Sequence, residues 1–134
     1  MKKTKVISST ELSQSIVEGM HEKKANDVVI MDLRKINTAI TDFFVICSGN
    51  SDTQIDAISR SVEEVVYKKT GQDPWNREGK LGKEWLLLDY VDVVVHVFQK
   101  EKRAFFDIES LWGDAEVTYY SDELKPSKEP INLI

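Results

Sequence analysis

The stretch EWLLLDYVDVVVHVF, residues 84–98, decides the fold. Two runs in it, Glu84 to Leu88 and Asp92 to Phe98, are rich in apolar and β-branched side chains, and this composition predicts two β-strands. The link between them is short, which predicts an antiparallel hairpin even though it lacks the Asn-Gly pair typical of tight hairpin turns. We therefore expect a sheet that contains this hairpin.

The two faces of the predicted hairpin differ in character, because side chains alternate across a sheet. With a two-residue loop, Leu88 pairs with Val93 and Trp85 pairs with His96. One face is then wholly aliphatic and is expected to be core: Leu86, Leu88, Val93, Val95 and Val97. The other face mixes large apolar side chains with a histidine and an aspartate: Trp85, Leu87, Asp89, Val94, His96 and Phe98. This mixed face is either a surface that contacts a partner or a face buried under helices, as in many central strands.

The residues before the hairpin predict a helix followed by two strands. Ser8 and Glu11 have the spacing of a capping box, and apolar residues recur after them at helical intervals as far as about Lys24. Residues 28–33 and residues 42–47 are short apolar runs rich in β-branched and aromatic side chains, which is typical of buried strands. The first part of the chain thus predicts one helix and two strands.

Two further helices are predicted, one on each side of the hairpin. Ser51 and Gln54 resemble another capping box, an apolar stripe follows, and Gly71 is placed to end that helix. Residues 71–83 are rich in Gly and Pro and predict an irregular loop, and residues 103–112 predict a short last helix. The resulting order of elements predicts an α/β (α+β) fold, in which helices pack against a mixed sheet.

Length and composition describe one ordinary globular domain. The 134 residues, 41% hydrophobic and 31% charged, suffice for a single core. Cys47 is the only cysteine, so no intramolecular disulfide can form, and no Cys/His cluster indicates a metal site. The basic opening MKKTK is followed by polar residues rather than by an apolar run, and no stretch approaches the length of a membrane span. We expect a cytoplasmic protein that needs no metal or cofactor.

The net charge of −5 bears on the kind of partner. The Lys and Arg residues are scattered, whereas proteins that bind nucleic-acid phosphates usually carry a basic stripe. An acidic domain is better suited to a basic protein surface. Little or no direct nucleic-acid binding is therefore expected.

Two enzyme hypotheses find little support in the sequence. Cys47 ends an apolar strand, where cysteines are usually inert, so a nucleophile and base pair with His96 is not favoured. The strand-to-helix turn at residues 49–51 has backbone N–H groups suited to a phosphate, as in nucleotidyl transfer. That chemistry also needs paired carboxylates for magnesium, and the acid-x-acid triplet at residues 107–109 falls in a predicted helix where alternate side chains diverge. No catalytic residue is predicted.

Three separated stretches resemble motifs of one known family. TDFFVICSGNS (residues 41–51) with the following DTQIDAIS, the hairpin EWLLLDYVDVVVHVF, and KRAFFDIESLWGDA (residues 102–115) are similar, in the same order, to the ribosomal silencing factor (Iojap-like) family. The resemblance covers roughly residues 10–115. It implies a silencing-factor domain over residues 1–115, followed by a polar, loosely held tail over residues 116–134.

The resemblance also implies a fold and a function. The implied fold is similar to that of nucleotidyltransferases but lacks their catalytic carboxylates. The implied function is to bind a basic protein, ribosomal protein fourteen, on the face of the large ribosomal subunit that meets the small subunit. Occupying that face would block subunit association and repress translation without any catalysis. The acidic net charge suits such a partner.

Partner-binding residues are expected on the mixed face of the hairpin and in the last helix. Trp85 is the leading candidate, because binding energy concentrates in desolvated Trp, Tyr and Arg side chains, and a position in the core is its alternative. The residues expected to contact the partner are Trp85, Leu87, Asp89, Tyr90, His96, Arg103, Phe106 and Glu109. The resemblance also marks Glu78 and Gly79 in the loop and Trp112, which is expected to close the core.

Several roles stay open on the sequence alone. Asp89 either pairs with a cation of the partner or caps backbone N–H groups of the turn. Arg103 and Glu109 are too far apart for a helical i,i+4 pair, and either reach outward or bridge within the protein. Val91 replaces the glycine usual in this turn, so the hairpin register is open to revision, and Phe106 stands where the family commonly has Tyr.

Three other hypotheses compete with silencing. The first is a large-subunit assembly factor that uses the same surface. The second is a vestigial nucleotide-binding protein. A homodimer formed through the aromatic face of the hairpin is also compatible with the pattern.

Overall fold

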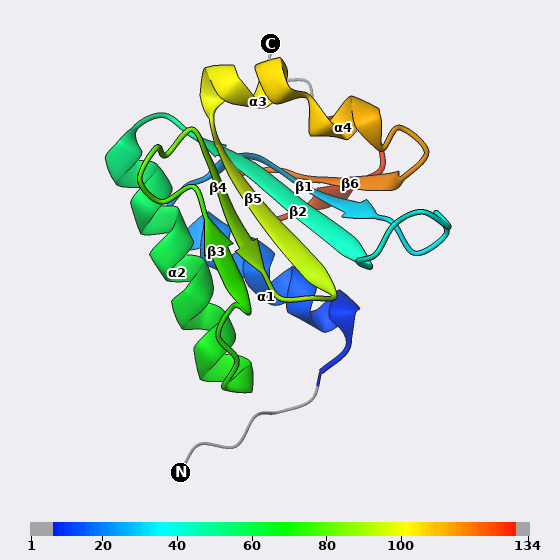
Figure 1. The fold of residues 1–134 in the computed structure, drawn as a ribbon, viewed down its shortest axis with the longest axis horizontal. Helices are drawn as coiled ribbons and strands as arrows, with labels where there is room; N and C mark the ends of the chain where they lie inside the picture. Colours follow the sequence, from blue (N-terminus) through cyan, green and yellow to red (C-terminus); the bar gives the residue numbers. More distant parts are fainter. Residues whose placement is uncertain (1–6, 131–134) are drawn as a thin grey trace.

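Seven strands within residues 7–130, the part of the chain that the computed structural model describes, form one mixed sheet (Figure 1). The strands are β1 (Asn26–Asp32), β2 (Phe43–Gly49), β3 (Asn76–Glu78), β4 (Trp85–Asp89), β5 (Val93–Gln99), β6 (Glu116–Tyr120) and β7 (Pro126–Ser127). Their order across the sheet is β3-β4-β5-β2-β1-β6-β7. The β2–β5 pair is parallel and the other neighbours are antiparallel. The predicted mixed sheet is confirmed.

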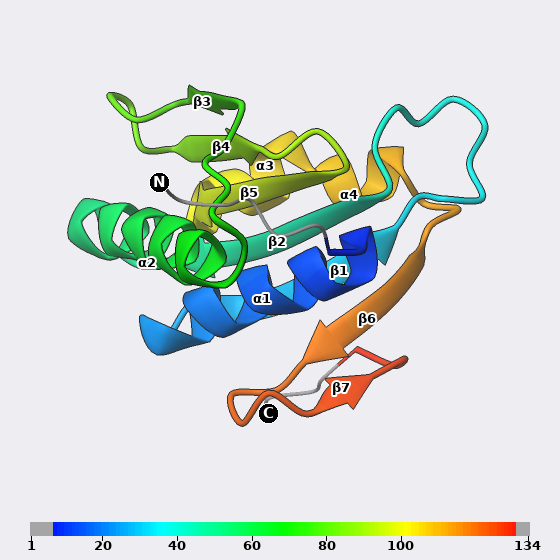
Figure 2. The same ribbon diagram turned by 90° about the horizontal axis from the view of Figure 1, so that it is seen from below.

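Helices lie on both faces of this sheet (Figure 2). The two long helices, on one face, are α1 (Ser9–Glu22) and α2 (Asp52–Thr70). The two short helices, on the other face, are α3 (Lys100–Phe106) and α4 (Ile108–Leu111). Because α3 and α4 are short, they cover only part of their face.

Local signals in the sequence set the ends of the long helices. The Ser8 hydroxyl accepts a hydrogen bond from the backbone N–H of Glu11 at 3.1 Å, and the Glu11 carboxylate accepts one from the backbone N–H of Ser8 at 3.4 Å. This is the predicted capping box at the start of α1. Gly71 ends α2 with a left-handed φ of 74°, which a residue without Cβ adopts at little cost.

The β4–β5 hairpin has the predicted faces but a different register. Trp85 pairs with Phe98 and Leu88 with Val95, each two residues along β5 from the predicted partner. A shift of two residues leaves every side chain on its predicted face, because the side-chain period is two. The aliphatic face is accordingly core, packed with α1 and α2, and its members are fully buried: Leu86, Leu88, Val93, Val95 and Val97.

A second, smaller core lies on the opposite face of the sheet. Its buried members are Val29, Met31, Leu33, Ile46, Phe98 and Ile108. Ile108 belongs to α4, so this cluster attaches the short helices to the sheet. Half-buried aromatic side chains surround it, among them Trp85 and Trp112. The expectation that Trp112 helps to close the core is in keeping with this position.

Two predicted segments differ from the structure in the middle of the chain. Residues 71–83 are not wholly irregular, because β3 pairs with β4. Its three exposed polar residues show no apolar alternation, so this edge strand left no pattern to detect. The single helix predicted over residues 103–112 is wrong as well. Asp107 adopts a left-handed φ of 47° and separates α3 from α4.

The prediction of a loosely held tail after residue 115 is wrong for the residues that follow directly. β6 pairs with β1 over four residue pairs, and its Val117 and Tyr119 pack against the smaller core. Four of the five residues of β6, in the sequence EVTYY, favour strands, so a local signal was present and the prediction missed it. Residues 1–6 and 131–134, at the outer ends of the two predicted segments, lie outside the described residues.

Candidate partner-binding groove

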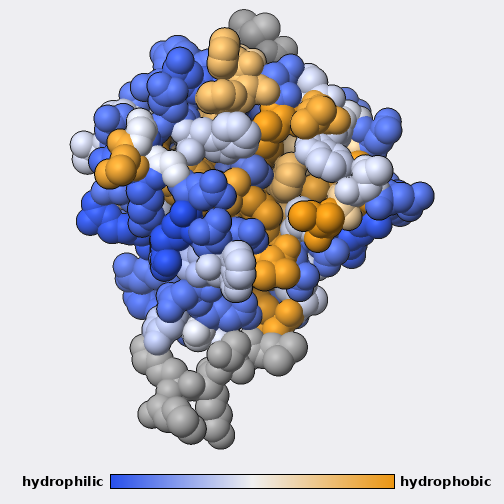
Figure 3. Space-filling view, in the orientation of Figure 1, coloured by the Kyte–Doolittle hydropathy of each residue, from blue (hydrophilic) through white to orange (hydrophobic). Residues whose placement is uncertain are grey.

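An open groove of about 660 Å³ lies on the sheet face that α3 and α4 cover only in part. Side chains of β2, β4 and β5 line it, together with the loop between β1 and β2 and residues near the β4–β5 turn. Figure 3 shows apolar side chains gathered in a strip down this face of the molecule. Prominent members of the lining are Ile40, Phe44, Trp75, Leu87, Val94 and Trp112. Such a concave apolar surface is suited to binding another molecule.

The mixed face of the hairpin is covered at one end and open at the other. His96 and Phe98 are buried, with exposed fractions of 3% and 0%. Leu87 and Val94 are half-buried and line the groove. The face is therefore buried at one end, as in many central strands, and open at the other end, where contact with a partner stays a prediction.

Trp85 holds the covered end of this face together. Its indole Nε1–H donates a hydrogen bond to Nδ1 of His96 at 2.9 Å. Its ring lies 5.0 Å from that of Phe98 and 4.9 Å from that of Phe106, centroid to centroid. Trp85 is half-buried, and Phe106 remains 39% exposed. Trp85 thus fixes the orientation of His96 beside the groove, and Phe106 presents an aromatic surface next to it.

His96 is a neutral hydrogen-bond donor beside the groove. The indole N–H can only donate, so Nδ1 of His96 accepts and its ring proton resides on Nε2. Burial lowers the pKa of His96 to about 3, so the ring is uncharged near neutral pH. Among residues 7–130, Nε2 has no hydrogen-bond partner. Nε2 is itself buried, and a buried donor without a partner is unfavourable for the folded state.

Asp89 caps the hairpin turn and also lines the groove. Its Oδ1 accepts a hydrogen bond from the backbone N–H of Val91 at 2.7 Å. The turn is tight, because the Asp92 N–H donates to the carbonyl of Tyr90 across Val91, whose φ is 75°. A β-branched residue is strained in this region of backbone conformation, which glycine adopts at little cost. The turn-capping role of Asp89 is therefore present, and its second carboxylate oxygen has no hydrogen bond to residues 7–130.

Tyr90 and Cys47 lie on the other side of the sheet. Tyr90 is 6% exposed and belongs to the core beneath α1 and α2, so it does not lie on the expected partner-binding surface. Burial raises the pKa of Tyr90 above its ordinary value. Cys47 is fully buried in the same core, which raises the pKa of its thiol to about 12. The sheet separates Cys47 from His96, so the two do not form a nucleophile and base pair.

Arg103 and Glu109 pair with each other inside the protein. Arg103 Nε and Nη2 donate to the two carboxylate oxygens of Glu109 at 2.8 and 3.1 Å. Arg103 Nη1 donates to the carbonyl of Asp27 at 2.7 Å and to the hydroxyl of Ser48 at 3.1 Å. The break at Asp107 brings the pair into contact despite their sequence separation. Of the two open roles, the internal bridge is the one observed.

The proposed phosphate cradle at the start of α2 is occupied by the protein itself. The Asn50 N–H donates to Oε1 of Gln54 at 2.7 Å, and the Gln54 N–H donates to the hydroxyl of Ser51 at 3.1 Å. The Gln54 amide also donates to the carbonyls of Lys23 and Lys24, which directly follow α1. These hydrogen bonds use the N–H groups of the loop to connect the start of α2 to the end of α1. The geometry therefore gives the nucleotide-binding alternative no support.

Three exposed apolar residues of the groove were not predicted to bind a partner, and one of them is Val91 in the hairpin turn. Trp75 is 79% exposed and Ile40 is 100% exposed, and both line the groove. Trp75 stands in the Gly- and Pro-rich loop, where an aromatic side chain has no core pattern to join, and that isolation was the available signal. Ile40 belongs to the long connection between β1 and β2, whose sequence gave no comparable indication.

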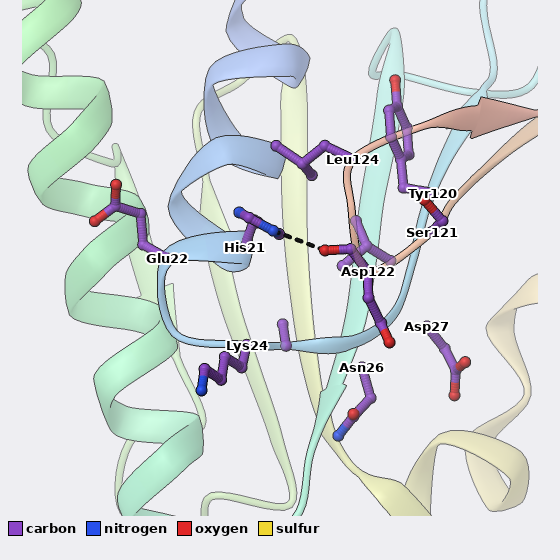
Figure 4. A pocket seen from close by; sticks show the side chains of 11 residues that line it. His21, Glu22, Lys24, Asn26, Asp27, Tyr120, Ser121, Asp122 and Leu124 are labelled. Carbon is purple, nitrogen blue, oxygen red and sulfur yellow. Dashed lines mark hydrogen bonds between the residues drawn. The ribbon is translucent and has the colours of Figure 1, made fainter.

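A second pocket, of about 650 Å³, lies at the end of α1 beside the β6–β7 turn (Figure 4). His21 Nε2 and the carbonyl of Asp122 are 2.8 Å apart there, which fastens the turn to the helix. The charged lining is mixed, with Lys24 beside Glu22 and Asp27. None of the predicted partner-binding residues lines this pocket. Within residues 7–130, no His, Cys, Asp and Glu side chains are grouped to bind a metal ion, and no helix is long and apolar enough to cross a membrane.

Comparison with known proteins connects this architecture to one family. The family model described as "Ribosomal silencing factor during starvation" matches residues 6–132. The ribosomal silencing factor RsfS of Halalkalibacterium halodurans is 42% identical over 109 residues, which are 81% of this chain and 92% of that protein. A crystal structure of a Chromobacterium violaceum protein superposes with a TM-score of 0.74 at 34% identity, covering 80% of this chain and 88% of that one. A mouse protein named "Mitochondrial assembly of ribosomal large subunit protein 1" is 29% identical over 72% of this chain and 43% of its own length. The chain belongs to the ribosomal silencing factor family.

Proposed function

We propose that this protein represses translation by binding the large ribosomal subunit through the groove and preventing the small subunit from joining. The observation that carries the proposal is the open apolar groove. It lies on the part of a sheet face that the protein's own helices leave uncovered. The family description names ribosome silencing, and a sterically acting factor requires a binding surface rather than a catalytic site. The proposal accordingly assigns no reaction to the protein and places it in the cytoplasm.

The partner in contact with the groove is proposed to be a basic ribosomal protein, ribosomal protein fourteen. The net charge of −5 favours association with a basic surface. Leu87, Asp89 and His96 line the groove and form the proposed contact surface, and Trp85 and Phe106 extend it toward α3. Arg103 and Glu109 support that surface from within, because their functional groups are bound to each other.

A role in assembly of the large subunit is the second candidate. The observation that favours it is the similarity to the mouse protein whose name refers to assembly of the mitochondrial large subunit. Such a factor would use the same groove. The two functions differ in whether occupancy of mature subunits prevents joining.

Co-sedimentation with purified large subunits tests the proposal. We expect the wild-type protein to migrate with the large subunit and not with the small subunit. The matched variant is Leu87→Glu, which places a charge on the half-buried apolar floor of the groove and is expected to weaken binding at least tenfold. Absence of wild-type binding, or equal binding of the variant, would contradict the proposed surface.

A further inference from the structure

The charged side chains that line the groove are all of one sign. Among the lining residues of the described chain, the charged ones are Glu78 and Asp89, both acidic. Glu78 lies opposite Leu87 in the β3–β4 ladder, and Asp89 is two residues from Leu87 on the same strand. All three side chains therefore project from one face, with Glu78 beside Leu87 across the ladder and Asp89 beside it along the strand.

Neither carboxylate is neutralised by the protein. Glu78 accepts a hydrogen bond from the Asn76 amide at 3.2 Å, and Asp89 accepts one from the backbone of Val91, but neither forms an ion pair within residues 7–130. The charged side chain on the other face of β3, by contrast, is paired within the protein. Arg77 there forms an ion pair with Glu63 at 2.6 Å. The negative charge of the groove is thus available to a cation from outside.

Trp75 adds an aromatic wall beside this acidic pair. The backbone N–H of Trp75 donates to the main-chain carbonyl of Asp89 at 2.7 Å, which fixes the main chain of Trp75 beside that residue. The side chain of Trp75 is 79% exposed. An indole face attracts Lys and Arg cations, and the attraction adds to that of a nearby carboxylate. Exposed Trp residues are also frequent anchors of protein interfaces.

The floor of the groove is apolar. Half-buried Leu87 and Val94 form it together with Phe44. His96 lies beneath this floor, and its Nε2, which has no hydrogen-bond partner among residues 7–130, is itself buried. The groove therefore combines an apolar floor, two carboxylates without ion pairs and an indole, which together match a peptide segment and not a phosphate backbone.

We infer that the groove recognises a lysine or arginine side chain of its protein partner. The aliphatic stem of that side chain lies over Leu87, its cation meets Glu78 and Asp89, and Trp75 covers it. A neighbouring apolar side chain of the same segment occupies the floor at Val94 and Phe44. The inference rests on the proposed function for the identity of the partner, but its chemistry follows from the charge and exposure of these residues. It assigns a binding role to Trp75 and Glu78 together.

A pair of isosteric substitutions tests the role of the carboxylates. The double variant Glu78→Gln, Asp89→Asn keeps the hydrogen bonds to Asn76 and Val91, because an amide oxygen also accepts, and removes both charges. The matched control, Glu123→Gln, Glu129→Gln, removes two exposed charges near β7, at the opposite edge of the sheet. We expect the groove variant and Trp75→Ala each to weaken binding to purified large subunits at least tenfold at moderate salt. The control is expected to bind within twofold of wild type.

Equal binding by the groove variant and wild type would overturn the inference and leave the proposed function standing. If the wild-type protein fails to bind subunits, a separate measurement tests whether the groove recognises a cationic side chain. A hexapeptide with a central Leu-Arg pair is titrated into labelled protein, followed by NMR at the Trp75 indole and the Leu87 methyl groups. The same peptide with citrulline in place of arginine is the uncharged control. Shifts with the arginine peptide alone support the inference, and equal shifts or none with both peptides contradict it.

Discussion

Trp85 and His96 are joined by a hydrogen bond, 2.9 Å from indole Nε1 to imidazole Nδ1, that connects the covered end of the sheet face to its open groove. The two residues do not face each other in the ladder, since Trp85 pairs with Phe98 and His96 with Leu87. They meet because diagonal neighbours on one face lie within reach of long side chains. This bond selects the tautomer of His96, because Nδ1 accepts and the ring proton therefore resides on the buried Nε2.

Replacing Trp85 with phenylalanine tests the contribution of this bond to stability. The ring contacts with Phe98 and Phe106 are largely kept, but Nδ1 of a buried histidine loses its partner. We expect the free energy of unfolding, measured by urea denaturation, to fall by about 1–3 kcal/mol. Trp112→Phe is the control, because the Trp112 indole has no hydrogen-bond partner among residues 7–130. Equal losses in the two variants would refute a specific contribution from the bond.

The buried position of His96 predicts a pH dependence of stability. Burial depresses its pKa from 6.5 to about 3, so between these values the unfolded state binds a proton that the folded state does not. The stabilising contribution is complete above pH 6.5 and is lost as the pH falls toward 3. We expect a loss of about 2 kcal/mol between pH 7 and pH 5 relative to His96→Phe, from the difference in proton binding. Parallel pH profiles of the two proteins by urea denaturation would show that the histidine titrates normally in the folded state.

Val91 offers a stabilising substitution. Its φ of 75° strains a β-branched residue, and its side chain is 58% exposed, so little packing is lost on removing it. We expect Val91→Gly to raise the free energy of unfolding by about 1 kcal/mol, the strain relief exceeding the added chain entropy. Val91→Ala keeps a Cβ at the strained position and should not show this gain. Thermal denaturation of both variants distinguishes the effects, and a glycine variant no more stable than the alanine variant would contradict the strain argument.

Arg103 is expected to stabilise the attachment of α3 and α4. Its guanidinium contacts Glu109, Asp27 and Ser48 in a planar arrangement that a lysine ammonium does not reproduce. Arg103→Lys should therefore lower the free energy of unfolding by about 1–3 kcal/mol. Arg34→Lys alters another two-point pair, with Asp32, but at a side chain 52% exposed, and should cost less than about 0.5 kcal/mol. Hydrogen exchange should rise in α3 and α4 of the first variant only, and unchanged exchange there would argue against this role.

The predicted elements that the structure confirms have strong local signals. The capping box at Ser8 and Glu11, the C-cap at Gly71 and the aliphatic face of the hairpin each follow from interactions among neighbouring residues or from period-two alternation. The hairpin register was wrong, because it depends on the turn, and the turn contains a valine in a conformation that its side chain disfavours. The assignment of side chains to the two faces was nevertheless correct, because the register shift was an even number of residues.

The site was predicted less completely, for a physical reason. Leu87, Asp89 and His96 were expected to share a surface because they alternate on one strand pair, and they do line one groove. Tyr90 stands one residue out of that alternation and is buried on the other face. Trp75 reaches the groove from the connection between α2 and β3, and Ile40 from that between β1 and β2, and their positions depend on tertiary packing that no local pattern encodes. Which of these residues contact a partner stays a prediction.

The central claim is that occupancy of the groove by the large subunit prevents subunit joining. The most direct measurement is the fraction of joined ribosomes in sucrose gradients, when purified large subunits are incubated with increasing wild-type protein or Leu87→Glu before small subunits are added. We predict that the wild-type protein lowers this fraction in proportion to its occupancy of the large subunit, and that Leu87→Glu leaves the fraction unchanged at the same concentrations. Full occupancy by the wild-type protein with undiminished joining would contradict the account and favour a role in assembly.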